Sequence, residues 1–197
     1  MSSIWFYQFL DDLPPIPQHW QNAALALAHD QQRSTADLSN NSTILPEYNR
    51  NIITPDRVAT VSRRTPRWEL SAEFEHWVKD NVCQDFIDAA VSISQGDSDI
   101  TGIHTDNRRH FTLMYLLETS NSGQITAWWQ ENGHPVQRSE RGYYLDNWDN
   151  VTKLAEVEFP LQRWIAFNAG ILHSIHNIQG SRIGIHVSLP ADPFADK

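Results

Sequence analysis

The sequence is poor in cysteine and in positive charge, and it has no long apolar run. Its single cysteine, Cys83, excludes an intrachain disulfide and a zinc site built from several cysteines. No stretch of about 18 apolar residues is present, so no membrane-spanning helix is expected. The first residues, MSSIWFYQFLDDLPP, lack the basic and apolar segments of a signal peptide. These absences predict a cytoplasmic protein with no membrane partner.

Acidic residues outnumber basic ones, with 24 Asp and Glu against 15 Lys and Arg and a formal net charge of −9 at pH 7. An acidic surface repels phosphate backbones, which disfavours nucleic acid as a partner. Hydrophobic residues make up 40% of the chain and charged residues 20%, a balance that favours a folded globular protein over a disordered one. The length of 197 residues predicts a single domain over 1–197.

The first part of the chain, residues 1–84, has the periodicity of helices and loops. Residues 17–32 (PQHWQNAALALAHDQQ) predict one helix. A second is expected over 71–82 (SAEFEHWVKDNV), because Ser71 is a good cap and Phe74 and Val78 lie on one helical stripe. The sequence therefore predicts a helical and loop extension that packs against whatever follows.

From residue 85 to 190 the pattern changes to short segments rich in β-branched and aromatic residues, separated by turn residues. About ten such segments predict an antiparallel sandwich, jelly roll or barrel. The last two, 171–178 (ILHSIHNI) and 181–189 (SRIGIHVSL), are joined by a short turn, so we expect them to pair with each other.

The segment 181–189 alternates between two kinds of side chain. Alternate residues of a strand point to opposite faces, and one face here is apolar while the other is polar. The apolar set is Ile183, Ile185, Val187 and Leu189, and the polar set is Arg182, Gly184, His186 and Ser188. The polar face either meets solvent or lines a polar cavity inside a barrel.

Histidine and aspartate stand two residues apart in GIHTDN, so His104 and Asp106 lie side by side if this segment is a strand. A barrel that adds one histidine from 171–178 would form a set of two histidines and one carboxylate. Such a set binds Fe(II) and leaves positions open for substrate and oxygen. A nearby arginine would hold a carboxylate co-substrate.

The order and spacing of these residues resemble the Fe(II)- and 2-oxoglutarate-dependent dioxygenases, in the prolyl-hydroxylase-like branch. The pattern is His104-Thr105-Asp106, then His173, then Arg182 nine residues later, and the resemblance covers residues 86–189. It implies a mainly β fold, the double-stranded β-helix or jelly roll, with the N-terminal helices packed against it. His176 is the rival to His173, but it lies only six residues before Arg182 and on the opposite strand face.

The resemblance also implies a role for each residue. His104, Asp106 and His173 would bind Fe(II), and Arg182 would hold the far carboxylate of 2-oxoglutarate, with O2 as the second co-substrate. A hydroxyl should complete the pocket for this carboxylate, and Tyr115 or Thr112 is expected to supply it. Only one of the two can do so, because the pleat of the strand turns only one of them inward. Ser94 and Gln95 are further candidates. Candidate substrate-binding residues are His186, Arg109 and Trp129, for which the structural alternatives are a core histidine, a solvated turn and a packing ring.

The implied reaction is hydroxylation of an unactivated C–H bond of a small molecule, such as an amino acid or related metabolite, with succinate and CO2 as co-products. Desaturation is also compatible with an intact Asp106. The alternatives are hydroxylation of a protein or peptide side chain, and a metal-binding jelly-roll module without catalysis.

Overall fold

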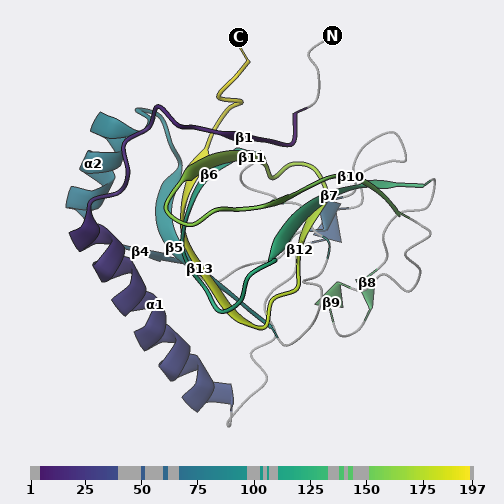
Figure 1. The fold of residues 1–197 in the computed structure, drawn as a ribbon, viewed down its shortest axis with the longest axis horizontal. Coiled ribbons are helices and arrows are strands. Elements are labelled where there is room, and N and C mark those ends of the chain that lie inside the picture. Colours follow the sequence, from purple (N-terminus) through teal and green to yellow (C-terminus); the bar gives the residue numbers. More distant parts are fainter. Residues whose placement is uncertain are drawn as a thin grey trace.

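The computed structural model shows a mainly β chain with two antiparallel sheets facing each other and two helices on one side (Figure 1). It describes residues 5–39, 50–51, 60–61, 67–96, 103, 106, 111–132, 138–139, 142–143 and 151–195. No helix in these ranges is long and apolar enough to cross a membrane.

The larger sheet has six strands, and every neighbouring pair is antiparallel. Their spatial order is β1 (Tyr7–Phe9), β11 (Trp164–Asn168), β6 (Phe111–Thr119), β13 (Gly180–Leu189), β5 (Asp88–Gly96) and β4 (Arg67–Glu69). We call this the major sheet. Strand β13 lies at its centre, between β5 and β6.

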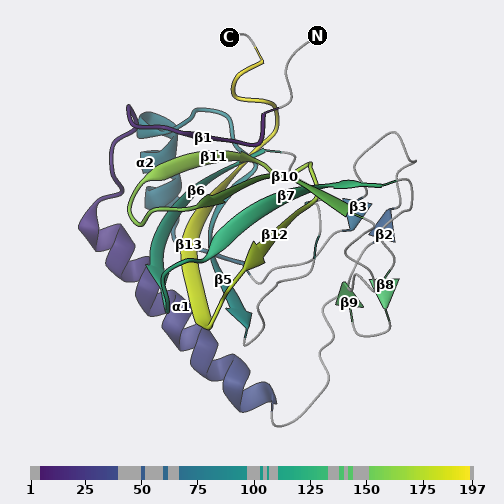
Figure 2. The same cartoon turned by 45° about the vertical axis from the view of Figure 1, so that its right-hand side comes forward.

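The minor sheet has three strands and faces the side of the major sheet that carries no helix (Figure 2). Its order is β10 (Val151–Glu158), β7 (Ile125–Glu131) and β12 (His173–His176). Two short ribbons complete the described strands: β2 (Arg50–Asn51) with β3 (Thr60–Val61), and β8 (Arg138–Ser139) with β9 (Gly142–Tyr143).

Both predicted helices are present, and both lie along the outer face of the major sheet (Figure 1). Helix α1 covers Gln18–Ser39 and extends beyond the predicted end, and α2 covers Ala72–Asn81. Ser71 caps α2: its hydroxyl accepts a hydrogen bond from the backbone N–H of Phe74 at 3.2 Å. Phe74 and Val78 are fully buried, so the predicted apolar stripe is the face that packs.

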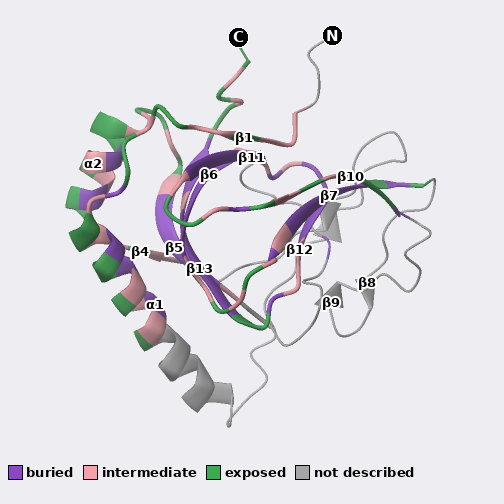
Figure 3. Ribbon diagram, in the orientation of Figure 1, coloured by how far each residue is buried: buried purple, intermediate pink, exposed green. Residues whose placement is uncertain are grey.

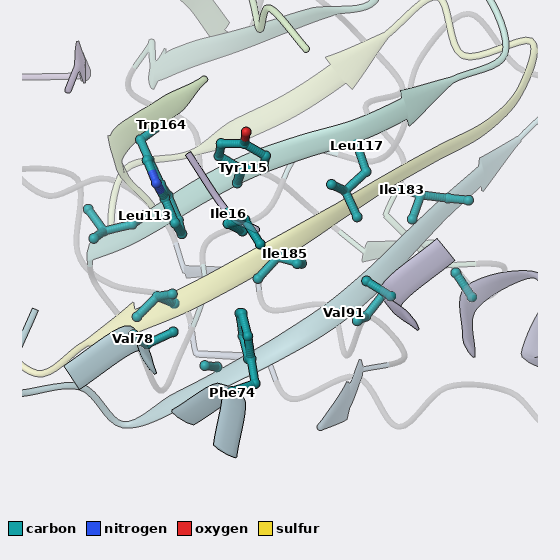
Figure 4. Close-up of a cluster of buried hydrophobic side chains, with 14 of the residues drawn as sticks. Ile16, Phe74, Val78, Val91, Leu113, Tyr115, Leu117, Trp164, Ile183 and Ile185 are labelled. Carbon is teal, nitrogen blue, oxygen red and sulfur yellow. The ribbon is translucent and has the colours of Figure 1, made fainter. Parts of the chain in front are cut away.

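A hydrophobic cluster joins these helices to the major sheet (Figure 4). The helices contribute Phe74 and Val78, and the strands contribute alternate residues such as Leu113, Ile183 and Ile185. We call this surface of the sheet the helix face. A second cluster, with Met114, Leu116, Trp128, Phe159, Ile165 and Phe167, fills the space between the two sheets. We call the corresponding surface the inner face; both faces are buried, as Figure 3 shows.

The expected pairing of the last two segments is wrong. Strand β12 pairs with β7 in the minor sheet, whereas β13 pairs with β5 and β6 in the major sheet. The short connection carries the chain from one sheet to the other, with Asn177 and Gly180 at φ values of 59° and 107°. A Cβ on Gly180 would meet the Ser120 hydroxyl at 2.6 Å, so this turn requires glycine.

The first 84 residues contribute more than helices and loops. Strands β1 and β4 come from this part of the chain and form the two edges of the major sheet. Three residues each are too few for a periodicity of two to be recognised in the sequence.

Candidate functional site

The polar side of β13 faces the minor sheet and not the solvent. Residues paired directly across antiparallel strands share a face, so His186, opposite Met114, and Ser188, opposite Thr112, both lie on the inner face. Arg182 also lies there, because its guanidinium reaches Thr126 of β7 in the opposite sheet. Of the two predicted alternatives for this polar face, contact with solvent or a place in the interior, the structure shows the interior.

Arg182 is the most deeply buried charged side chain in the described part of the chain, with 2% of its surface exposed. Its Nη1 donates to the hydroxyl of Thr126 at 3.2 Å, and its Nη2 lies 3.9 Å from the sulfur of Met114. The guanidinium carbon stacks 4.8 Å from the ring centre of Phe159. Among the described residues, Arg182 Nε has no hydrogen-bond partner.

No acidic side chain among the described residues offsets the charge of Arg182. Burial alone lowers the pKa of Arg182 to about 10, and no carboxylate contributes. The guanidinium therefore remains protonated at neutral pH while its donors are only partly used. A buried cation is costly unless it is paired, so this arrangement suits an anion that enters from outside the chain.

His173 opens β12 and is 5% exposed. Its Nδ1 lies 2.9 Å from the carbonyl oxygen of Ile171. A carbonyl only accepts, so Nδ1 is the donor in this contact, and Nε2 is the atom that the neutral ring would present to a metal. This is how a ligating histidine is usually oriented by the residues behind it.

Asp106 lies close to the same turn and is 8% exposed. Its backbone N–H donates to the carbonyl of Ala169 at 2.9 Å, and Ala169 lies between β11 and β12, four residues before His173. The structure thus brings two of the three predicted ligands to one loop region. His104 lies outside the described residues, and among the residues that are described no group of three His, Cys, Asp or Glu side chains could hold a metal.

Phe167 connects the two sheets at this site. Its ring meets His173 edge-on at 5.8 Å and His186 edge-on at 6.4 Å. His186 of the major sheet and His173 of the minor sheet therefore contact the same ring, that of Phe167. This placement brings His186 near His173, one of the predicted metal ligands, and its predicted role toward substrate stays a prediction.

Thr112 and Tyr115 lie on opposite faces of β6. Thr112 pairs with Ser188 and Phe167 on the inner face, and it is fully buried. Tyr115 packs in the helix-face cluster, where its ring lies tilted against Trp164 with the ring centres 5.0 Å apart (Figure 4). Burial raises the pKa of Tyr115, and a backbone hydrogen bond at Ile16 partly opposes this. The structure does not bring Tyr115 together with Arg182, because the two side chains lie on opposite faces of the major sheet.

Thr126 is the hydroxyl that contacts Arg182, and the sequence reasoning missed it. It is 3% exposed and belongs to β7, in the sheet opposite to Arg182. Sequence spacing gives no direct signal for a contact across two sheets. The alternation of side chains along β7 gives a weak signal that Thr126 points inward, because Thr126 shares a face with the fully buried Trp128.

Trp129 lies on the outer face of the minor sheet, away from Arg182 and His173. Its Nε1 donates to the hydroxyl of Ser174 at 2.8 Å, and the same hydroxyl lies 2.8 Å from Nε2 of His176. Burial lowers the pKa of His176, Lys153 lowers it further, and Glu156 opposes them. The structure separates Trp129 and His176 from the inner face, and the inward ring of the pair is Trp128.

Three weaker candidates are placed as follows. Ser94 pairs with Arg182 across β5 and β13 and is half-buried. Gln95 pairs with Ser181, one step out of register with Arg182, and its side chain lies outside the described residues. Arg109 also lies outside them.

Comparisons with known proteins give no assignment by sequence. No family model matches the chain, and no curated protein matches it. Among solved structures, AviO1 from Streptomyces viridochromogenes Tue57 is 12% identical with a TM-score of 0.49, covering 95% of this chain and 91% of that one. A Pseudomonas putida prolyl-4-hydroxylase is 11% identical with a TM-score of 0.42, covering 94% and 93%. At these values neither likeness assigns a fold or an activity to this chain.

Proposed function

We propose that this chain is an Fe(II)- and 2-oxoglutarate-dependent dioxygenase on a double-stranded β-helix, and that it hydroxylates a small molecule. The observation that carries the proposal is Arg182, a buried guanidinium with no acidic partner among the described residues. A single buried cation beside a single hydroxyl matches one carboxylate group. A phosphate would call for more positive charge.

Arg182 and Thr126 would hold the far carboxylate of 2-oxoglutarate. Met114 and Phe159 cover the guanidinium with apolar atoms, which excludes water and strengthens the charge pair. Thr126 orients one edge of the guanidinium and keeps its own oxygen beside the bound carboxylate. The remaining donors of Arg182, including Nε, are then available to the carboxylate.

His173 and Asp106 would contribute two of the three iron ligands, with His104 as the third. The proton on Nδ1 of His173 faces Ile171, which leaves Nε2 as the ligating atom. The hydrogen bond from Asp106 to Ala169 ties the aspartate segment to the turn that precedes His173. When bound, Fe(II) with 2-oxoglutarate and O2 supplies the oxidising power that breaks an unactivated C–H bond.

Binding of co-substrate analogues tests the assignment of Arg182. Mn(II)-loaded wild-type protein should bind 2-oxoglutarate at least a hundredfold more tightly than 2-oxobutyrate, which lacks the far carboxylate, as isothermal titration calorimetry would measure. The Arg182→Gln variant should lose this preference, because only the far carboxylate meets the guanidinium. Equal affinity of the wild type for both keto acids would contradict the proposal.

A further inference from the structure

A second buried polar row crosses the inner face at the other end of β13. The register places Thr112 of β6 opposite Ser188 of β13, and Ser188 opposite Asp88 of β5. Thr112 and Ser188 are almost completely buried, at 0% and 1% exposed, and Asp88 is half-buried. The row therefore leads from the interior toward the surface.

Thr112 is the unusual member of this row. Its hydroxyl oxygen is buried and has no hydrogen-bond partner in the described part of the chain. Buried hydroxyls are nearly always hydrogen-bonded, since leaving one unsatisfied costs free energy. An unsatisfied hydroxyl on the inner face beside Phe167, the ring that His173 packs against, indicates a partner that the described residues do not supply.

Thr112 is too far along the sheet to share the carboxylate held by Arg182. Six residues separate Arg182 from Ser188, the partner of Thr112, which at about 3.3 Å per residue is ~20 Å along the strand. The Met114 side chain lies between the two positions, with its sulfur at the guanidinium and its methyl over Gly184. The structure therefore places Thr112 apart from Arg182, which leaves the Thr112 hydroxyl for a group other than the far carboxylate of 2-oxoglutarate.

The chemistry of this row of side chains favours a ligand group that donates hydrogen bonds. Ser188 donates its hydroxyl proton to Asp88 at 2.7 Å, so toward any further group the Ser188 oxygen acts as an acceptor. Thr112 adds a second oxygen one strand spacing away, about 4.8 Å between backbones. A carboxylate at the open end makes the whole row attractive to positive charge.

We propose that Thr112 and Ser188 bind the amino group of an amine-bearing substrate such as a free amino acid. This inference rests on the proposed function, because Arg182 and the metal ligands fix which end of the inner face is left for the substrate. The ammonium group donates to both hydroxyl oxygens, and Asp88 stabilises its charge through Ser188. The reacting carbon then lies toward His173, on the Phe167 side of Thr112.

The test uses Ni(II)-loaded protein with saturating 2-oxoglutarate, which binds substrate without turnover. Each proteinogenic L-amino acid and its Nα-acetyl derivative is added separately, and the rise in the unfolding midpoint identifies binders whose Kd is then measured by calorimetry. We expect at least one free amino acid to bind and its acetyl derivative to bind at least tenfold more weakly. Thr112→Val, which removes one hydrogen bond and keeps the shape, should weaken the binder about tenfold.

Thr126→Val is the matched control, because the same change is made at the hydroxyl beside Arg182. It should weaken 2-oxoglutarate and leave the amino acid, whereas Thr112→Val should leave 2-oxoglutarate unchanged. Three results would overturn the inference: equal binding of the acetyl derivative, no effect of Thr112→Val, or no amino-acid binder in a protein that binds 2-oxoglutarate. Failure of the wild type to bind 2-oxoglutarate at all would instead contradict the proposed function, and the inference with it.

Discussion

Neighbouring residues of β13 serve two different environments. Ile183, Ile185 and Val187 point to the helix face and are fully buried among other apolar side chains. Arg182, alternating with them, points to the inner face, where its Nε has no hydrogen-bond partner within the described chain. On the helix face of β13 the side chains are fully packed without a ligand. On its inner face a polar group still needs a hydrogen-bond partner.

This difference separates the residues that make the fold stable from those that make a site. On the helix face the buried aliphatic side chains, such as Ile183, Ile185 and Val187, gain free energy from packing alone. On the inner face Arg182 and Thr112 keep polar atoms buried that no described residue hydrogen-bonds, at a cost to the folded state. Changes on the helix face should therefore alter stability, and changes on the inner face should alter binding.

The largest loss of stability is expected from truncation on the helix face. Ile185→Ala removes a fully buried side chain and leaves a cavity between the sheet and α2, so the free energy of unfolding should fall by about 2–5 kcal/mol. Urea denaturation measures this. The folded fraction should still bind 2-oxoglutarate with wild-type affinity, and a selective loss of affinity at unchanged stability would contradict the separation of the two faces.

Arg182→Met should give the opposite pattern. Methionine keeps the apolar stem and removes the unpaired charge, so the free energy of unfolding of the ligand-free protein should be unchanged or higher. The affinity for 2-oxoglutarate should fall by about 2–5 kcal/mol, because the bound carboxylate loses its buried partner. If the variant is instead strongly destabilised without ligand, Arg182 has a structural role.

A smaller effect is expected at the start of α2, which supports the helix face from outside. Ser71→Ala removes the hydroxyl that caps Phe74 N–H, and the free energy of unfolding should fall by about 1 kcal/mol. Ser71→Asp restores an acceptor and should recover most of this loss. Equal destabilisation by both variants would show that the cap is not the cause.

The smallest effect is expected at an exposed ion pair that belongs to neither face. Arg163 donates to Asp11 at 2.6 and 2.7 Å, and this lowers the pKa of Asp11. A lowered folded-state pKa means that the stabilisation is present at neutral pH and is lost as the pH falls through the folded-state pKa of Asp11. Asp11→Asn should lower the unfolding midpoint slightly at pH 7, and the shift should shrink as the pH is lowered into the acid range; an equal shift at neutral and acid pH would rule out the charge as the cause.

Periodicity predicted the elements of the fold well wherever one face is buried. The helix that begins after Ser71 and the alternation of 181–189 are both as expected, because the side chains that signal them are the ones that pack. The pairing of β12 with β7 was not predictable from the short turn before β13. A three-residue connection is compatible with a hairpin and with a crossing between sheets, and only the completed packing decides between them.

The site was predictable in its strands and less so in its contacts. Sequence alternation placed Arg182 and His186 on one face, and the structure agrees. It left Thr112 and Tyr115 undecided, because both faces of β6 are buried and the strand is apolar on both sides. The contact between Arg182 and Thr126 depends on the distance between two sheets, which no spacing along the chain encodes.

An anaerobic titration of the metal-free protein, first with Fe(II) and then with 2-oxoglutarate, tests the central claim most directly. We expect a weak visible charge-transfer band in the wild type, absent in His173→Ala and retained in His176→Ala. The latter is the matched control, since His176 lies on the outer face of the same strand. A band of equal strength in His173→Ala, or no band in the wild type at any concentration, would contradict the assignment of this chain as an Fe(II)- and 2-oxoglutarate-dependent dioxygenase.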